Sequence, residues 1–171
     1  MKILVFSDSH GRNELMSIII EHFKEEVNTV LFLGDCVPDF TDFQYIYTDK
    51  VFLSVNGNCD FDSYEPTERL LDIAGKKIFM THGHNFGVKS NHTRILNEAL
   101  KLKASVCLYG HSHRPEAFKE QGVYLMNPGS ISEPRYTDYP TFGVINIKDT
   151  LISLNIFLVE EKGILPYRTI D

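Results

Sequence analysis

Cysteine is scarce in this chain, and its few copies do not indicate a disulfide framework. Cys36, Cys59 and Cys107 are odd in number, and no two of them form a C-x-x-C pair. We therefore expect reduced thiols, as in cytoplasmic proteins. No disulfide is needed for stability either, because a chain of 171 residues can bury roughly 70% of its unfolded surface.

Long apolar runs and an excess of basic residues are also missing. No run approaches the roughly 20 residues that span a membrane, and Met1 leads into a strand-like run without a basic leader segment. There are 17 Lys and Arg against 23 Asp and Glu, a formal net charge of −6. Polymeric nucleic acid is therefore not an expected partner, since no basic stripe is available to displace counterions. We expect a cytoplasmic protein that does not bind membranes.

The first part of the chain alternates strand-like and helix-like segments, which favours a parallel sheet. Apolar periodicity predicts one helix over residues 12–26 and another over 90–102, with a short helix within 38–47. Residues 60–67, which contain a proline, are predicted to form a loop.

The second part changes character and predicts antiparallel hairpins. Strand-like runs separated by short turns cover residues 115–119, 122–126, 141–147 and 151–158, whereas 160–171 shows no periodicity. The run from Leu151 to Val159 fits either a buried strand or an edge strand that pairs with a second copy in a homo-oligomer. We expect a single α/β domain over 1–171, with two mixed sheets flanked by helices.

Residues that bind metals follow five of the predicted strands. The last of them is the pair in Gly110-His111-Ser112-His113, which can aim two imidazoles at one point. In chain order, the residues are Asp8 and His10, Asp35, Asn58, His82 and His84, and His111 and His113. Carboxylate and imidazole ligands suit manganese, iron, zinc or nickel, and magnesium where carboxylates dominate.

The candidate ligands are too many for one ion that must keep open positions. They suffice for two ions joined by a bridging carboxylate. Such a pair suits hydrolysis at phosphorus, because it activates a shared water and stabilises the charge on the phosphate oxygens. A protein nucleophile is then not required.

Five short blocks together resemble the calcineurin-like metallophosphoesterase superfamily. The Asn-Cys-Asp variant at residues 58–60 and the Asn127-Pro128-Gly129-Ser130 segment resemble its small bacterial and archaeal phosphodiesterase branch. The blocks are Asp8-Ser9-His10-Gly11, Gly34-Asp35, Gly57-Asn58-Cys59-Asp60, Thr81-His82-Gly83-His84 and Gly110-His111-Ser112-His113. The resemblance implies a four-layer α-β-β-α sandwich with the site at the carboxyl ends of strands.

The resemblance also implies a role for each ligand. Asp8, His10 and His113 would hold the first metal, and Asp35 would bridge. Asn58, His82 and His111 would complete the second, with Asn58 also acting in catalysis by touching the substrate phosphate. The implied cofactors are two divalent ions, with manganese the first choice and nickel, iron, zinc or magnesium also compatible.

The implied reaction is hydrolysis of a small organic phosphodiester by a hydroxide that bridges the two ions. Two alternatives stay open. A phosphomonoesterase could use the same two-metal site, and a non-catalytic scaffold could share the fold, although every ligand position is filled here.

Cys59 departs from the pattern of the superfamily. Many members carry a histidine at this position, which is the usual proton donor to the leaving group. A thiol with a pKa near 8.5 is a poor substitute, so His84 or a water on the second metal would take this role, or no group would. We therefore expect a preference for substrates with good leaving groups.

We also have expectations for three residues near the ligands. Asp60 either holds a ligand turn by hydrogen bonding or is an ordinary loop carboxylate. His92 is expected to be a solvated surface residue, like His22. Gly11 leads into the first predicted helix, whose free N–H groups could face an anionic substrate.

Overall fold

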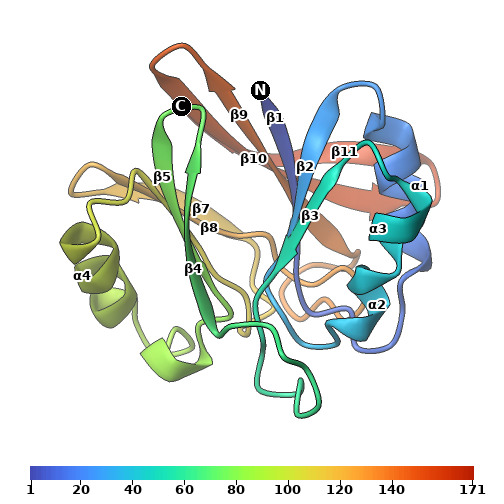
Figure 1. Cartoon of the computed structure of the whole chain (residues 1–171), viewed down its shortest axis with the longest axis horizontal. Coiled ribbons are helices and arrows are strands. Elements are labelled where there is room, and N and C mark those ends of the chain that lie inside the picture. The colour runs from blue at the N-terminus through green and yellow to red at the C-terminus, as the bar shows by residue number, and fades with distance from the viewer.

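The computed structural model describes residues 1–171 and contains two mixed sheets that pack face to face (Figure 1). The first sheet has six strands in the order β11–β10–β9–β1–β2–β3. Its strands are β1 (Lys2–Phe6), β2 (Val27–Phe32), β3 (Val51–Ser54), β9 (Thr141–Lys148), β10 (Leu151–Glu160) and β11 (Gly163–Ile170). Strands β1, β2 and β3 run parallel, and β9 pairs with β1 in the antiparallel direction.

The second sheet has five strands in the order β4–β5–β6–β8–β7. Its strands are β4 (Glu68–Ile73), β5 (Lys76–Thr81), β6 (Val106–Leu108), β7 (Glu116–Glu120) and β8 (Val123–Asn127). Strands β5, β6 and β8 are parallel, while β4 and β7 close the two edges as antiparallel partners. Each sheet therefore contains a set of parallel strands whose carboxyl ends lie on the same side of the sheet.

Helices cover the outer face of each sheet, which makes the predicted four-layer α-β-β-α arrangement (Figure 1). The helices are α1 (Glu14–Phe23), α2 (Pro38–Thr41), α3 (Phe43–Ile46), the 3₁₀ turn η1 (His84–Phe86) and α4 (Thr93–Lys101). Helices α1 to α3 lie on the first sheet and α4 lies on the second. None of the helices is long and apolar enough to cross a membrane.

Three apolar layers hold the sandwich together, and β1 shows how one strand serves two of them. Ile3 and Val5 point into the core between the sheets, whereas Leu4 and Phe6 point toward α1. All four side chains are fully buried. This period-two alternation with apolar residues on both faces is what a central strand of a covered sheet requires.

The structure differs from the sequence-based predictions mainly in two strands that were not predicted and in the lengths of the helices. Strand β4 was not predicted, because its exposed charged residues alternate with only partly buried apolar ones. Strand β11 lies in the tail that showed no periodicity, since most of its residues are exposed and its order comes from pairing with β10. Helices α1 and α4 are shorter than predicted, and α2 and α3 divide the region predicted as one short helix.

The prediction that residues 151–159 form a free edge strand is wrong. Strand β10 is paired on both sides, with β9 and with β11. Its inward side chains Ile152, Leu154 and Ile156 are buried between the sheets. The other interpretation of this run, a buried strand, is the correct one.

Candidate metal centre

Five of the predicted ligands have an unusual backbone conformation and follow strands closely. Their φ angles are positive, at Asp8 (56°), His10 (46°), Asp35 (63°), His111 (65°) and His113 (56°). The left-handed region is disfavoured for residues with a Cβ and gathers at functional sites. The left-handed turns reverse the chain at the strand ends, and surrounding hydrogen bonds hold them in place.

The first group brings together the side chains of Asp8, His10 and His113. His113 Nε2 lies 3.1 Å from Asp8 Oδ1 and 3.2 Å from His10 Nε2. His10 Nε2 lies 4.0 Å from the same Asp8 oxygen. One oxygen and two imidazole nitrogens therefore converge on one small space, and they belong to the three residues that the resemblance assigns to the first metal.

The second group brings together Asp35, His82 and His111. His82 Nε2 lies 3.4 Å from Asp35 Oδ1, while the other carboxylate oxygen, Oδ2, lies 3.9 Å from His10 Nε2 in the first group. Asp35 thus has one oxygen near each group, which is the geometry that a bridging ligand needs.

Main-chain carbonyls orient two of the histidines. His82 Nδ1 lies 2.7 Å from the carbonyl oxygen of Leu33, and His113 Nδ1 lies 2.8 Å from that of Glu133. A carbonyl only accepts, so each Nδ1 carries the proton and each Nε2 presents a lone pair to the group. In their neutral form, both imidazoles are therefore held in the tautomer that can bind a cation.

Two buried atoms of the two ligand groups lack any hydrogen-bond partner, and both face the space between the groups. Asp8 Oδ2 accepts from Ser7 Oγ at 2.5 Å and from the backbone N–H of His111 at 3.1 Å. Asp8 Oδ1 and His82 Nε2 make no hydrogen bond although they are buried. Unsatisfied buried polar atoms are costly, and a divalent cation would satisfy both. The residues present therefore fit a metal.

Two glycines let the ligand turns approach each other. A Cβ at Gly57 would lie 2.2 Å from Asp35 Oδ1, and a Cβ at Gly110 would lie 2.8 Å from Asp8 Oδ2. Both distances are shorter than van der Waals contact, so any side chain here would displace a candidate ligand. Residues 57 and 110 are therefore glycines because the carboxylates of Asp35 and Asp8 occupy the space where a Cβ would lie.

Asp60 organises the turns that present Asp35 and Asn58. Its Oδ2 accepts from the N–H groups of Asp35 and Gly57, both at 2.8 Å. Its Oδ1 accepts from the N–H groups of Cys36 (2.8 Å) and Val37 (2.7 Å). The interpretation of Asp60 as a residue that holds a ligand turn is thus supported, and the ordinary loop carboxylate is ruled out.

The Asn-Pro-Gly-Ser segment after β8 ties two ligand turns together, a role that the sequence did not reveal. Asn127 Nδ2 donates to the Gly110 carbonyl at 2.8 Å and to Ser112 Oγ at 3.0 Å. Ser130 Oγ donates to the carbonyl of Asp8 at 2.7 Å. Only the presence of the block was visible in the sequence, because its partners, two main-chain carbonyls and the Ser112 hydroxyl, lie elsewhere along the chain.

The charged groups of the site shift one another's pKa values. Burial lowers the pKa of His82 and of His113, but the facing carboxylates outweigh burial and raise both above 6.5. Burial raises the pKa of Asp35, and the stronger combined effect of His82 and the Cys59 N–H lowers it. Burial and the nearby charge of His82 lower the pKa of His111 to about 4. Asp35 is therefore ionised and His111 neutral at neutral pH, which are the forms that bind metals.

The three residues predicted to act in catalysis lie at the margin of the groups. Cys59 Sγ lies within 4.8 Å of ligand atoms of His10 and Asp35, although Cys59 was not predicted as a ligand. The ring of His84 packs at an angle against those of His82 and His111, with centroids 5.4 and 6.1 Å away. The exposed amide of Asn58 donates to Cys59 Sγ at 3.3 Å, which places it beside the ligand atoms of His10 and Asp35.

Neither Cys59 nor His84 is set up as a strong acid. Burial and the Asp35 charge raise the pKa of the Cys59 thiol to about 11. Burial and the charge of His82 lower the pKa of His84, so its imidazole is neutral at neutral pH. Both pKa shifts agree with the expectation that the protein offers no strong acid to protonate the leaving group.

Two expectations about neighbouring residues are wrong. His92 is not a solvated surface residue: its Nε2 lies 2.9 Å from Glu116 Oε1, and its ring packs against Tyr109 and Phe118. The N–H of Gly11 does not face a substrate, because it donates to Asp39 Oδ2 at 2.8 Å. In addition, α1 begins only at Glu14, so its first turn is displaced from the ligand turn.

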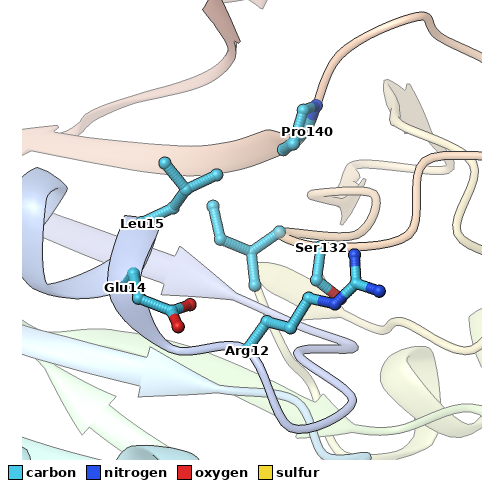
Figure 2. Close-up of a pocket in the computed structure, with 6 residues that line it drawn as sticks. Arg12, Glu14, Leu15, Ser132 and Pro140 are labelled. Atoms are coloured by element: carbon cyan, nitrogen blue, oxygen red, sulfur yellow. The ribbon is translucent and has the colours of Figure 1, made fainter.

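A cavity of about 230 Å³ lies beside the loop that follows His10 (Figure 2). Arg12 extends across it toward Ser132, while Leu15 and Pro140 form an apolar wall. Ser132 Oγ also donates to the carbonyl of Asp8 at 3.2 Å, which places this cavity next to the first ligand group.

Comparison with known proteins is consistent with this site. The sequence profile of the calcineurin-like phosphoesterase superfamily domain matches residues 1–150. The probable metallophosphoesterase YsnB of Bacillus subtilis is 30% identical over 157 residues, covering 92% of this chain and 90% of that protein. The phosphodiesterase YfcE of Escherichia coli is 26% identical over 179 residues, covering 91% and 93%.

A solved structure shows the same fold. The crystal structure of a predicted phosphoesterase from Streptococcus pneumoniae superposes with a TM-score of 0.80 at 28% identity, covering 97% of this chain and 96% of that one. The mixed sheets and flanking helices of this chain are therefore those of its structural relatives.

Proposed function

Since the chain belongs to the calcineurin-like phosphoesterase superfamily, we propose that it is a two-metal phosphodiesterase acting on small organic phosphodiesters. The observation that carries the proposal is the position of Asp35 between two groups of ligands. Its two carboxylate oxygens face His82 on one side and His10 on the other. This arrangement suits two cations with one shared ligand.

The proposed ligands divide between the groups as the sequence analysis expected. Asp8, His10 and His113 hold one ion, Asp35 is shared, and His82, His111 and Asn58 hold the other. Asn58 can join after rotation of its exposed side chain. When bound, divalent ions supply Lewis acidity: they lower the pKa of water and offset charge on the phosphate. We propose manganese as the ion that supports the highest activity.

The protein's own residues position the substrate and limit proton transfer. Asn58, on the exposed side of the site, offers amide N–H donors to a phosphate oxygen. His84 is neutral, so it can donate a hydrogen bond to the leaving group but is a poor proton donor. Cys59 holds its proton too tightly to act as an acid, with a pKa of about 11. Substrates with stable leaving groups are therefore favoured.

Diester rather than monoester hydrolysis is supported by the relatives. Both the Escherichia coli protein and a Methanocaldococcus jannaschii relative, 29% identical over 162 residues, are named phosphodiesterases. The ligands themselves serve either reaction, so the substrate choice must be measured.

The test compares bis(p-nitrophenyl) phosphate with p-nitrophenyl phosphate. Protein stripped with a chelator is reloaded with manganese, nickel, zinc or magnesium, and the kcat/KM of both substrates is measured. We expect no turnover without metal and a higher kcat/KM for the diester. Dominant monoester turnover would replace the proposal with a phosphomonoesterase, and no turnover with any metal would favour a scaffold.

A series of aryl diesters tests the proton-transfer argument separately. If no protein acid serves the leaving group, the rate should fall steeply as the pKa of the leaving phenol rises. A flat dependence would show that a protein group does protonate it, and Cys59→Ala and His84→Ala would then identify which one.

A further inference from the structure

A second, smaller cavity adjoins the candidate metal centre on the side of the second sheet. Its volume is about 90 Å³, and it lies between the loop before α4, the His111–Arg114 turn and Tyr136. This exceeds the roughly 10–15 Å³ that one water molecule needs, so the cavity has room for one tetrahedral oxyanion.

The residues that line the cavity offer donors and positive charge. Lys89 and Arg114 both line it, and Lys89 has no ion-pair partner. The guanidinium of Arg114 lies over the ring of Tyr136, 5.5 Å from its centroid, which holds it at the cavity wall. Both residues are exposed, and together they bring two positive charges to one cavity in a chain of net charge −6.

Ser112 is buried, at 8% exposure, and has a hydroxyl proton to spare. Its Oγ accepts from Asn127 Nδ2 at 3.0 Å and from the N–H of Arg114 at 3.2 Å. Both lone pairs are thereby used, and no acceptor is present for the O–H. A hydroxyl in this state is a donor that awaits an acceptor, and it belongs to the lining of the cavity.

The one carboxylate at the cavity is largely committed elsewhere. Glu116 Oε1 accepts from the hydroxyl of buried Tyr109 at 2.8 Å and lies 2.9 Å from His92 Nε2. Its Oε2 lies 4.0 Å from Arg114 Nε, a distance too long for a hydrogen bond. The fixed charges of Lys89, Arg114 and Glu116 therefore sum to a positive value.

The chain links this cavity to the metal centre. Ser112 stands between His111 and His113, and Arg114 follows directly. The cavity and the metal centre therefore share the His111–Arg114 turn, and we take them as neighbouring sites that one molecule can span. We propose that the cavity binds a second anionic group of the substrate, so that the preferred substrates are phosphodiesters that carry a further phosphate. This inference rests on the proposed function.

The test uses two diesters that differ in one phosphate. One is thymidine 5′-(p-nitrophenyl phosphate), and the other carries an additional 3′-phosphate. We expect the second substrate to have the higher kcat/KM in the native protein, by about tenfold, as for one charge-assisted contact. Lys89→Ala and Arg114→Ala should each bring this ratio toward one, chiefly through KM. A ratio near one in the native protein would refute the inference, as would a ratio that both variants preserve.

Lys148→Ala is the matched control, because it removes the same charge from an exposed position. Lys148 ends β9, which runs antiparallel to β1, so it lies at the opposite edge of the sheet from the ligand turns. The ratio should be unchanged in this variant. A similar fall there would mean that only the overall charge matters, and would also refute the inference.

A binding measurement separates this inference from the proposed function. Calorimetry on chelator-treated protein compares thymidine 3′,5′-bisphosphate with thymidine 5′-monophosphate. Tighter binding of the bisphosphate that depends on Lys89 and Arg114 supports the cavity even if no diester is hydrolysed. Equal binding of both refutes it even if diesters are hydrolysed. If inorganic phosphate binds but the two diesters are hydrolysed equally, the site takes a free ion and the inference is wrong.

Discussion

Replacing Asp60 by asparagine should loosen two ligand turns at once. The carboxylate accepts four backbone N–H groups, from Asp35, Cys36, Val37 and Gly57, at 2.7 to 2.8 Å. An asparagine keeps one accepting oxygen and turns an NH₂ group toward the other pair of N–H groups. Two of the four hydrogen bonds are then lost and their donors left without a partner.

The size of the effect follows from these contacts. A hydrogen bond to a charged acceptor contributes about 1.5–3 kcal/mol. The polar turns are partly open to water, which replaces some of this energy. We therefore expect Asp60→Asn to lower the free energy of unfolding by about 3 kcal/mol. Because Asp35 loses its support, the affinity for manganese should fall by about 10- to 100-fold.

Both quantities can be measured against a close control. Urea denaturation of chelator-treated protein gives the free energy of unfolding, and calorimetry gives the affinity for manganese. Asp62→Asn changes the same charge two residues away at an exposed position without a hydrogen bond of its side chain, and should change the stability by less than about 0.5 kcal/mol. If Asp60→Asn is as stable as this control and binds manganese as tightly, the role assigned to Asp60 is wrong.

Three further predictions concern the candidate ligands. Asp35→Asn should abolish turnover of bis(p-nitrophenyl) phosphate, because it removes charge from the shared position; undiminished activity would mean that the ligands are misassigned. His113→Ala should weaken binding of one ion, with activity partly recovered in excess manganese, and activity that is independent of manganese concentration would contradict this. In chelator-treated protein, His111 should reduce stability as the pH falls from about 6.5 to 4, because the unfolded chain takes up a proton there and the folded site, with a pKa of about 4, does not. His111→Ala should remove this part of the pH dependence of urea denaturation while His22→Ala retains it, and identical profiles for the two variants would refute the assignment.

Much of the fold followed from patterns within short segments. The apolar runs and the spacing of Leu15, Ile19 and Phe23 marked the central strands and α1, because burial on one or both faces leaves a periodic trace. Strands β4 and β11 left no such trace. Their residues are largely exposed, and they are strands only because β5 and β10 offer a hydrogen-bonding edge.

The candidate ligands could be predicted for a related reason. A parallel strand ends at the same edge as its neighbours, so the residue types at strand ends indicated which side chains meet. The division into Asp8, His10 and His113 on one side and Asp35, His82 and His111 on the other came from the resemblance to the superfamily, and the structure brings the same residues together. His92 was misjudged, since its partner Glu116 lies on a strand whose position no local pattern reveals.

The residue types alone determined which chemistry gathers at this edge: carboxylates and imidazoles, with glycines beside them. The tertiary structure decided how each is held. The carbonyls of Leu33 and Glu133 set the tautomers of His82 and His113, and Asp60 ties down the turn of Asp35. Main-chain groups are the same in every residue, so their contacts depend on the path of the chain in space and leave no mark in the sequence.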